Sequence, residues 1–406
     1  VTAWFERGAA YVSRQYQQLL ETEHSVHIFA RGGERDAIGN PAWDGPRVTW
    51  GRDSADPLTQ GLHLEHFKSW IDLNHLDLVF FNEQRWWAPV LLANRLGVKT
   101  GAYVDYYTEE TVPLFGCYDI LVCNTRRHWS MFKWHPGARY VPWGTDLSLF
   151  KPISQSPVNP GSVTFFHSAG YAPVRKGTDL LLQAFAKLTG ESRLVVHAQH
   201  SLKASLPDLE NLISDLEHSN HLRIYERTVP APGMYHLGDV YVYPSRLDGL
   251  GLTVAEALAC GLPAIVSDNP PMNEFIQEDN NGRLARISRR YSRADGYYWP
   301  QCVVDIDHLA ACMQTYVDEL PYLQIKKDAA RKSAESGLDW FHNGRDMPGL
   351  FTQLVKQQSS EKDAAEQQAR VYDANYFTNL TLQQRYPRVY RAVTLLERLR
   401  RKLRAV

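Results

Sequence analysis

The sequence lacks the patterns that mark several common classes of protein. It has five cysteines among 406 residues, at irregular spacings and without a Cys-x-x-Cys pair, so neither a zinc site nor a disulfide framework is expected. No stretch of about 18 consecutive apolar residues occurs, and the start has no secretory pattern. The formal net charge of -1 gives no global attraction to nucleic acid. We therefore expect a cytoplasmic protein with reduced thiols and no nucleic-acid partner.

The composition is that of a folded protein with more than one domain. Apolar residues make up 44% of the chain and charged residues 22%, which is far from the composition of disordered proteins. A single hydrophobic core stops growing near about 250–300 residues, so a chain of 406 residues predicts two domains. Val1 and Thr2 have the character of the end of a β-strand, and we expect further residues upstream of them.

Short apolar runs alternate with segments of helical periodicity, which is the pattern of βαβ units around a parallel sheet. In the first half we expect strands at Ser25–Ala30, Leu76–Phe81, Val98–Val104, Ile120–Cys123 and Tyr140–Trp143, and helices at Tyr11–Glu21, Glu65–Leu73, Trp87–Leu96 and Arg127–Trp134. In the second half we expect strands at Val163–Ser168, Leu194–Ala198, Val240–Tyr243 and Ala264–Ser267, and helices at Thr178–Leu188 and Leu252–Cys260. The fold class predicted is α/β, with a doubly wound domain in each half.

The best domain boundary is the segment 151–161, which is dense in proline and turn-forming residues. It predicts a first domain over residues 1–150 and a second over 151–337. Between Arg385 and Arg404 eight residues are basic, and apolar residues recur among them at helical spacing. Residues 385–406 therefore predict a basic amphipathic helix, which either packs on the protein itself or lies on an anionic membrane surface.

The segment from Val240 to Pro263 carries the strongest chemical signal in the chain. A strand ends at Pro244, a loop with the sequence Asp248-Gly249-Leu250-Gly251 follows, and a helix begins near Leu252. Such a loop directs backbone N–H groups and the positive end of a helix dipole towards an anion. In an open α/β domain, ligands bind at this edge of the sheet.

Asp248 and Glu256 place one carboxylate before the loop and one within the first turns of the helix. A carboxylate repels a bound diphosphate, so each is better suited to accept hydrogen bonds from hydroxyls of a ribose or a sugar. The loop begins like a dinucleotide fingerprint, but Val254 stands where the third glycine would be. A nicotinamide or flavin enzyme is therefore disfavoured.

This segment resembles the donor-binding signature of retaining glycosyltransferases of family 4, which have the GT-B fold. The resemblance extends over about residues 1–345 and is specific from Val163 to Gly282. It implies two Rossmann-like domains facing each other across a cleft, with helices from about residue 338 to residue 406 returning to the first domain. It also implies that Glu256 binds the donor ribose and Asp248 the donor sugar, while Gly249, Leu250, Gly251, Leu252 and Thr253 contact sugar and diphosphate. The family usually has glutamate where this chain has Asp248.

The segment that follows the strand Val163–Ser168 supplies cations. The pair Arg175 and Lys176 precedes a helix, where two positive charges would neutralise a diphosphate and stabilise the charge that grows as the glycosidic bond breaks. Lys176-Gly177 matches the family's lysine-glycine pair, and the resemblance adds Gly170 and Tyr171 to the donor-binding residues. The family's separate arginine is replaced by Tyr171, and Arg175 is its candidate substitute.

The first domain is expected to face the acceptor. Arg7, Gly8 and Ala9 open a helix where the family keeps a small-residue loop facing the cleft. Asp105 lies where the family often has a histidine, and it is either a replacement for that histidine or a structural residue. Trp86 and Trp87 either line an acceptor groove or pack in the core.

The resemblance implies transfer of a sugar, with retention at the anomeric carbon, from a nucleotide diphosphate sugar to a glycan, a lipid-linked saccharide or a metabolite. Asp248, Glu256, Arg175, Lys176 and Asp105 are the candidate catalytic residues. No cofactor and no metal are expected. Two alternatives stay open: a nucleotide-sugar epimerase of the same architecture, and a sugar-nucleotide-binding protein without turnover.

Overall fold

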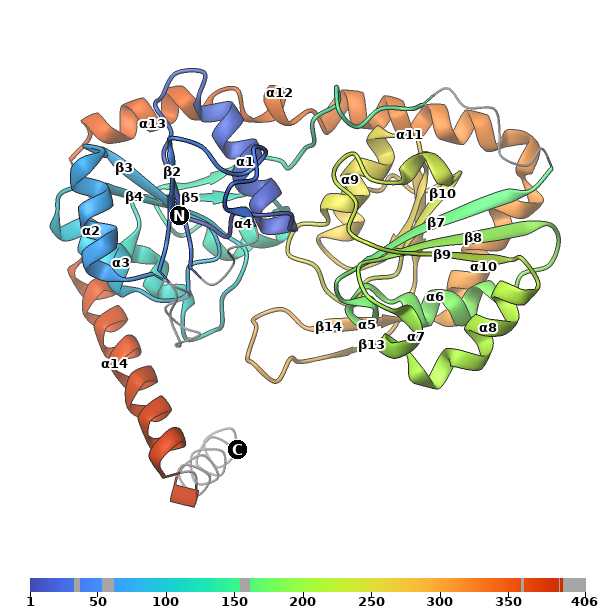
Figure 1. Ribbon diagram of the computed structural model, residues 1–406. Coiled ribbons are helices and arrows are strands. Elements are labelled where there is room, and N and C mark those ends of the chain that lie inside the picture. Colours follow the sequence, from blue (N-terminus) through green and yellow to red (C-terminus); the bar gives the residue numbers. More distant parts are fainter. Residues whose placement is uncertain (33–36, 53–61, 154–160, 359–360, 387, 390–406) are drawn as a thin grey trace.

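The chain forms two α/β units, joined by the segment that follows residue 143 and by helices near the C-terminus (Figure 1). The computed structural model describes residues 1–32, 37–52, 62–153, 161–358, 361–386 and 388–389. Its described residues contain no helix that is long and apolar enough to span a membrane. All five cysteines are unpaired.

The N-terminal unit is built on parallel strands. Strand β1 pairs with β2, and β3 to β6 form a four-stranded sheet in sequence order. Val1 and Thr2 connect the two groups, because Thr2 pairs with Ala30 and the carbonyl of Val1 accepts from the amide of Asn82. The strands are β1 (Ile28–Ala30), β2 (Val48–Trp50), β3 (Leu78–Phe81), β4 (Lys99–Tyr103), β5 (Ile120–Cys123) and β6 (Ala138–Tyr140).

Helices flank these strands and bury their apolar faces against them. The buried residues of α1 include Val12, Tyr16 and Leu19, which follow helical spacing. Helix α4 begins after Thr125, whose hydroxyl accepts from the amide of His128 and so caps the helix. The helices of this unit are α1 (Gly8–Leu20), α2 (Leu64–Leu73), α3 (Ala88–Arg95) and α4 (Arg126–Phe132), with a 3-10 helix at Val112–Cys117.

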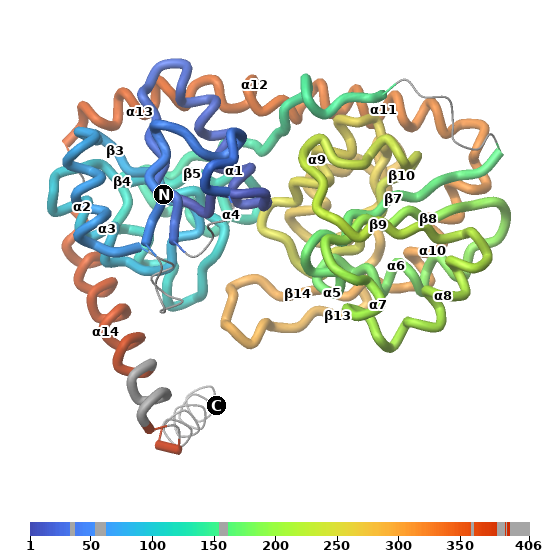
Figure 2. Tube along the Cα trace, viewed as in Figure 1, coloured from blue at the N-terminus to red at the C-terminus, as the bar shows by residue number. Residues whose placement is uncertain are grey.

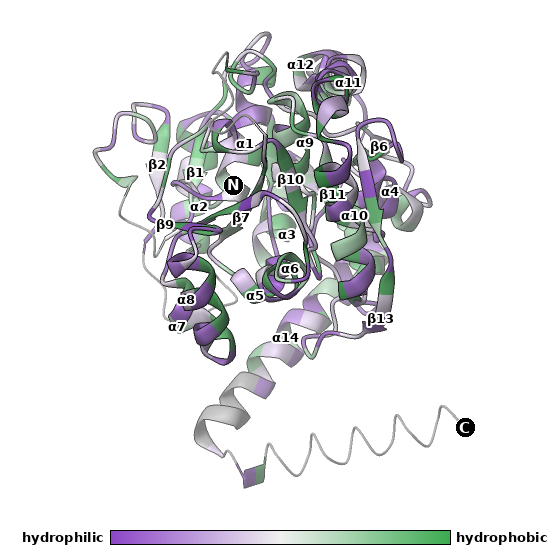
Figure 3. Ribbon diagram, turned by 90° about the vertical axis from the view of Figure 1, so that its right-hand side faces the viewer, coloured by the Kyte–Doolittle hydropathy of each residue, from purple (hydrophilic) through white to green (hydrophobic). Residues whose placement is uncertain are grey.

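The C-terminal unit has a six-stranded parallel sheet in the order β12-β11-β10-β7-β8-β9. The strand order reverses between β7 and β10, which are direct neighbours. Hydrophobic residues concentrate on strands such as β10, whereas the outer helix α8 is mixed (Figure 3). The strands are β7 (Val163–Gly170), β8 (Ser192–Ala198), β9 (Leu222–Glu226), β10 (Val240–Tyr243), β11 (Ala264–Ser267) and β12 (Gly282–Ala285).

Helices cover both faces of this sheet, as in other doubly wound folds (Figure 2). They are α5 (Pro173–Lys176), α6 (Thr178–Phe185), α7 (Leu202–Ser205), α8 (Glu210–His218), α9 (Leu252–Ala259), α10 (Ile306–Asp318) and α11 (Leu323–Gly337). Short 3-10 helices lie at Pro207–Leu209, Tyr235–Leu237, Met272–Phe275 and Leu320–Tyr322.

An antiparallel hairpin extends from the C-terminal unit to the N-terminal unit (Figure 1). Its strands are β13 (Ile287–Tyr291) and β14 (Gln301–Val304). Residues between them reach the N-terminal unit, where Tyr297 pairs with Thr108 and the amide of Tyr298 donates to the carbonyl of Tyr107. We call residues 287–304 the strap.

The last helices pack on the N-terminal unit. They are α12 (Trp340–Gly344), α13 (Met347–Lys356) and α14 (Asp363–Arg385). Trp340 is fully buried against Tyr16 and Trp143. Asp373 of α14 accepts from the amides of Trp87 and Ala88, and the helix then projects away from the body (Figure 1). Most of the predicted basic helix 385–406 lies outside the described residues.

The predicted elements and the structure differ mainly at the sheet edges. Strands β5, β10 and β11 have the predicted bounds, whereas the strand expected at Tyr140–Trp143 is β6 at Ala138–Tyr140. Pro142 has no N–H to donate, which limits the ladder at that end. Strands β2, β9 and β12 and the strap have no counterpart among the predicted strands, because they are short or partly polar and give no strong apolar pattern. The exposed residues among them lie on β9 and on the first strand of the strap.

Candidate active site

The loops that follow β7 and β10 meet at the carboxyl edge of the C-terminal sheet, where the strand order reverses. Gly177 makes this meeting possible. Its φ is 75°, and a Cβ built on it would lie 2.1 Å from the carbonyl oxygen of Pro244. No side chain fits there, so the segment 175–177 packs directly against the start of the loop that carries Asp248.

The structure brings Arg175, Lys176 and Asp248 together. The Lys176 ammonium lies 2.6 Å from Oδ2 of Asp248 and also donates to the hydroxyl of Tyr243. Arg175 Nη1 lies 3.5 Å from the same carboxylate oxygen and donates to the carbonyl of Leu247 at 2.9 Å. The Tyr243 hydroxyl donates to Asp248 Oδ2 as well. Both cations therefore gather around one acid at the edge of the sheet.

The charged groups of this cluster shift one another's pKa values. Burial alone would raise the pKa of Asp248, but the charges of Lys176 and Arg175 hold it well below its usual range. Burial, followed by the neighbouring Arg175, lowers the pKa of Lys176 to about 8, although Asp248 acts in the opposite direction. Asp248 is therefore ionised, and Lys176 can lose its proton under mildly alkaline conditions.

Glu256 lies on α9 and accepts a hydrogen bond from the hydroxyl of Tyr235. Burial raises its pKa from 4.5 to about 7, although Tyr235 and Lys176 act against this rise. No salt bridge to Glu256 is present among the described residues. This carboxylate is thus held in place by a neutral donor and keeps capacity for further hydrogen bonds.

The loop between Asp248 and Glu256 presents mainly backbone. Gly251 has a φ of 82° and leads directly into α9. Oδ1 of Asp248 lies 3.5 Å from the amide of Leu250 and 3.4 Å from that of Gly251. The helix start and the loop amides together give a region of positive potential beside the two acids.

The N-terminal unit faces this loop. A Cβ on Gly8 would lie 3.5 Å from Cδ1 of Leu252, so the segment Arg7-Gly8-Ala9 borders the start of α9. Asp105 follows β4 and is half-buried, and burial raises its pKa to about 7, with Glu83 adding to the rise. Burial also raises the pKa of Tyr297 to about 12, and the charges of Asp105 and Asp248 both add to it. The Tyr297 hydroxyl also donates to the backbone carbonyl of Asp105 at 3.1 Å, which connects the strap to the end of β4.

Some of the predicted residues do not join the cluster. The side chain of Tyr171 is 75% exposed and packs against His200, although Gly170 next to it ends β7 near the site. Trp87 is buried among Phe115 and Tyr118, in agreement with the core alternative. Trp86 is also buried and contacts Phe377.

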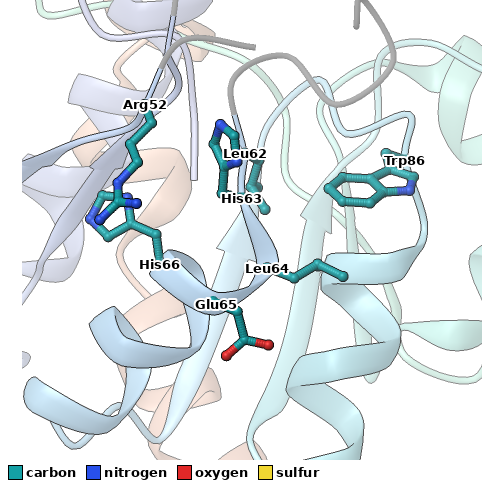
Figure 4. Close-up of a pocket in the computed structure, with 7 residues that line it drawn as sticks. All are labelled: Arg52, Leu62, His63, Leu64, Glu65, His66 and Trp86. Carbon is teal, nitrogen blue, oxygen red and sulfur yellow. The ribbon is translucent and has the colours of Figure 1, made fainter.

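Trp86 lines a separate pocket of the N-terminal unit (Figure 4). This pocket has a volume of about 380 Å³ and is lined by Arg52, Leu62, His63, Leu64, Glu65, His66 and Trp86. None of these residues belongs to the loops after β7 and β10, so the pocket is distinct from the candidate site.

Other residues of the site were not predicted. Tyr235 and Tyr243 bind the two acids, and on the N-terminal side Arg127 and His128 hydrogen-bond to the carbonyls of Asp248 and Gly249. These four residues lie far from the loop in sequence or look like ordinary core aromatics, so only the fold reveals them. Among the described residues, no group of three or more His, Cys, Asp or Glu side chains is arranged to hold a metal ion.

Comparison with solved structures defines the class of the fold. A sucrose-phosphate synthase from Thermosynechococcus elongatus superposes with a TM-score of 0.68 at 18% identity, over 88% of this chain and 96% of that chain. HepE of Anabaena, solved in complex with UDP and glucose, superposes with a TM-score of 0.66 at 13% identity, over 87% of this chain and 98% of that chain. The predicted GT-B fold, with two Rossmann-like domains, is confirmed.

The sequence comparisons cover a smaller part of the chain than the structural ones. Residues 151–290, which contain the candidate site, match the family model described as glycosyl transferases group 1. A GDP-mannose-dependent alpha-(1-6)-phosphatidylinositol dimannoside mannosyltransferase of Mycobacterium tuberculosis is 31% identical over 243 residues, which cover 56% of this chain and 61% of the relative. A D-inositol 3-phosphate glycosyltransferase of Xylanimonas cellulosilytica is 30% identical over 166 residues, which cover 36% of this chain and 38% of the relative. The chain thus spans less than two thirds of either relative.

Proposed function

We propose that this protein is a retaining glycosyltransferase of family 4, which moves a sugar from a nucleoside diphosphate sugar to a hydroxyl-bearing acceptor. One observation carries the proposal: a paired lysine and arginine, a glycine-rich loop at a helix start and a half-buried glutamate converge at the strand-order reversal. The match of residues 151–290 to group 1 glycosyl transferases supports it.

Each group has a role in this proposal. Glu256 accepts hydrogen bonds from the donor ribose, and the amides of residues 249–253 contact the diphosphate and the sugar. Lys176 and Arg175 stabilise the negative charge that develops on the departing diphosphate. Asp248 holds Lys176 through Oδ2 and presents Oδ1 to the donor sugar. Gly170 and Tyr171 border the donor, and Arg7, Gly8, Ala9 and Asp105 face the acceptor.

The chemistry that these roles imply is transfer with retention. The bond between the anomeric carbon and the diphosphate oxygen breaks, the acceptor oxygen forms a new bond to the anomeric carbon on the same face, and the leaving diphosphate takes the proton of the acceptor hydroxyl. The side chains mainly position the two substrates and stabilise charge. No cofactor is needed for this step.

The relatives support the classes of donor and acceptor that we propose. One solved neighbour was obtained with UDP and glucose, and the name of one relative specifies GDP-mannose. Both donors are nucleoside diphosphate sugars. The relatives named above act on a phosphatidylinositol mannoside and an inositol phosphate, which favours a glycan, a lipid-linked saccharide or a small metabolite as acceptor.

A thermal-shift screen against nucleoside diphosphate sugars tests the proposal, because a ligand that binds only the folded state stabilises it by about 2.7 kcal/mol at a hundred times its Kd. The best donor is then incubated with acceptors of the three kinds, and the products are identified by mass spectrometry and NMR. A new glycoside with the donor's anomeric configuration is expected. Release of an epimerised nucleotide sugar from the donor alone, or binding without any product, would overturn the proposal.

The pH dependence of the donor kcat/KM should be bell-shaped. Glu256, with a pKa of about 7, must be ionised to accept the ribose hydroxyls, so kcat/KM should fall below about pH 7. Lys176, with a pKa of about 8, must be protonated, so kcat/KM should also fall above about pH 8. Lys176→Arg should remove the alkaline fall, because arginine stays charged. A flat profile between pH 6 and pH 9 in the wild-type protein would contradict these roles.

We also propose that the basic segment 385–406 contacts an anionic membrane surface. Its eight basic residues alternate with apolar ones at helical spacing. In a flotation assay, the full chain should bind vesicles that contain phosphatidylserine and lose this binding when residues 386–406 are removed. Neutral phosphatidylcholine vesicles are the control. Equal binding by the full and the shortened chain would contradict this role.

A further inference from the structure

Two consecutive side chains of the N-terminal unit hold two consecutive carbonyls of the donor loop. Arg127 Nη2 donates to the carbonyl of Asp248 at 2.5 Å, and His128 Nε2 lies 3.0 Å from the carbonyl of Gly249. Both side chains belong to α4 and are buried, with 5% and 0% of their surface exposed. The backbone of the donor loop is therefore fixed from the opposite unit.

A second set of contacts fixes α4 itself against the C-terminal unit. Glu274 accepts from the backbone amides of Arg126 and Arg127 at 2.6 and 2.9 Å, at the start of α4. Arg127 Nη1 also donates to the carbonyl of Pro270 at 2.6 Å. The position of α4 relative to the loop is thus set by charge-assisted hydrogen bonds on both sides.

Two consecutive hydrogen bonds connect His128 to the strap. The indole N–H of Trp299 donates to the hydroxyl of Tyr107 at 2.5 Å, and that hydroxyl lies 2.9 Å from Nδ1 of His128. An indole nitrogen can only donate, so the Tyr107 hydroxyl accepts from Trp299, and the carbonyl of Gly249 can only accept, so Nδ1 of a neutral His128 is left to accept the proton of the Tyr107 hydroxyl. Nε2 of His128 then carries the hydrogen that the carbonyl of Gly249 accepts. These hydrogen bonds therefore fix the tautomer of His128 that carries its hydrogen on Nε2.

The charge state of His128 agrees with this assignment. Burial, with a contribution from the positive charge of Arg127, lowers the pKa of His128 to about 3. The ring is therefore neutral, as the acceptor role of Nδ1 requires.

Because the peptide bonds of the loop are trans, the contacts to its carbonyls also determine the direction in which its amide N–H groups point. In a trans peptide the C=O and the N–H point in opposite directions, and the only cis bonds among the described residues are Ala231-Pro232 and Pro270-Pro271. Holding the carbonyls of Asp248 and Gly249 towards α4 turns the amides of Gly249 and Leu250 away from α4. The amide of Leu250 accordingly points to the side of the loop where Oδ1 of Asp248 lies, at a long 3.5 Å, and the proposed function places the donor on that side.

We infer that Arg127 and His128 are positioning residues, which aim the amides of Gly249 and Leu250 at the donor diphosphate when the two units are closed. This inference rests on the proposed function. The strap takes part through Trp299 and Tyr107, which fix the tautomer of His128. Closure of the acceptor-side unit thereby completes the diphosphate site of the other unit.

The test compares the binding of nucleoside diphosphates and monophosphates by calorimetry. UDP with UMP and GDP with GMP are the probes, and the pair whose diphosphate binds the wild-type protein more tightly is used. His128→Leu should weaken diphosphate binding about tenfold and leave monophosphate binding within about twofold, because it removes one hydrogen bond that orients the loop. His128→Gln keeps an N–H that can reach the carbonyl of Gly249 and should restore most of the loss.

Two further variants separate positioning from folding. His135→Leu is the matched control, because both ring nitrogens of His135 are hydrogen-bonded within the N-terminal unit at the other end of the strands. It should leave the ratio of the two affinities unchanged. Trp299→Phe keeps His128 and should reduce diphosphate affinity in the same selective way, but less.

A failure of this inference can be distinguished from a failure of the proposed function. If the wild-type protein binds neither UDP nor GDP, the proposed function fails. If it binds one of them, and His128→Leu changes diphosphate and monophosphate affinity by the same factor or changes neither, the inference fails alone. An effect of His135→Leu as selective as that of His128→Leu would also overturn it.

Discussion

Replacing Glu256 with alanine is expected to abolish the thermal stabilisation that the best nucleoside diphosphate sugar gives the wild-type protein. Glu256 is a half-buried carboxylate that accepts a hydrogen bond from the neutral hydroxyl of Tyr235 and has no salt bridge among the described residues, which leaves acceptor capacity for two ribose hydroxyls. Hydrogen bonds to a charged group contribute about 1.5–3 kcal/mol each, so the donor Kd should rise by a factor of about 10² or more. Thermal shift and calorimetry measure this loss.

A second substitution separates binding from folding. Because burial raises the pKa of Glu256 from 4.5 to about 7, its charged form costs the folded state free energy above about pH 7 and nothing below pH 4.5. This cost approaches about 3 kcal/mol. Glu256→Gln should therefore melt at a higher temperature than the wild-type protein at pH 8, with a smaller difference at pH 5, while it binds donor poorly.

The matched control for this pair is Glu217→Gln, at a surface residue that pairs with Lys203. It should change neither donor binding nor the pH dependence of melting. A full donor-induced shift in Glu256→Ala would remove Glu256 from the donor site.

Replacing Lys176 with alanine is expected to lower kcat by a factor of about 10² to 10³, the usual loss when a preorganised group that stabilises transition-state charge is removed. Its ammonium is fixed 2.6 Å from Asp248 and bonded to Tyr243, so no reorganisation is needed as the diphosphate departs. The donor KM should rise much less than kcat falls, because the interaction strengthens as negative charge develops. Steady-state kinetics with the best donor and acceptor measure both constants.

Two variants control this experiment. Lys187→Ala removes an exposed lysine that pairs with Asp307 and should leave both constants unchanged. Lys176→Arg keeps the charge and should recover part of kcat. A loss confined to KM, with kcat unchanged in Lys176→Ala, would mean that Lys176 binds donor without taking part in the chemical step.

Strands that are buried on both faces were predicted well from the sequence, and exposed strands were not. The runs at β5, β10 and β11 are apolar on both faces, as the central strands of a covered sheet must be, and their bounds were predicted to the residue. β9 has the sequence LRIYE at the edge of the sheet, and the exposed strap begins with ISRRY. Neither gives an apolar run, because only one face or none is buried.

The site was predictable where it depended on local sequence. The spacing of Asp248 and Glu256 around a glycine loop, and the position of Lys176 before Gly177, both follow from strand–loop–helix units of a doubly wound sheet. The direct contact of Lys176 with Asp248 was not predicted, because it depends on β7 and β10 being neighbours in space.

The contributions of Arg127, His128 and Trp299 depend on how the two units meet. His128 contacts a loop 121 residues away, and the Trp299–Tyr107 contact spans 192 residues. A buried histidine on a helix of mixed composition gives no sequence signal that separates such a role from ordinary packing. Only the assembled interface reveals it.

The central claim is that a nucleoside diphosphate sugar binds between Lys176, the loop 249–253 and Glu256, and the most direct measurement is a crystal structure of the protein with its best donor from the thermal-shift screen. The account predicts the ribose hydroxyls on Glu256, the diphosphate against the loop amides and Lys176, and the sugar towards Asp248 and the segment 7–9. A donor bound elsewhere, or bound with its diphosphate turned away from Lys176 and its ribose away from Glu256, would contradict the account.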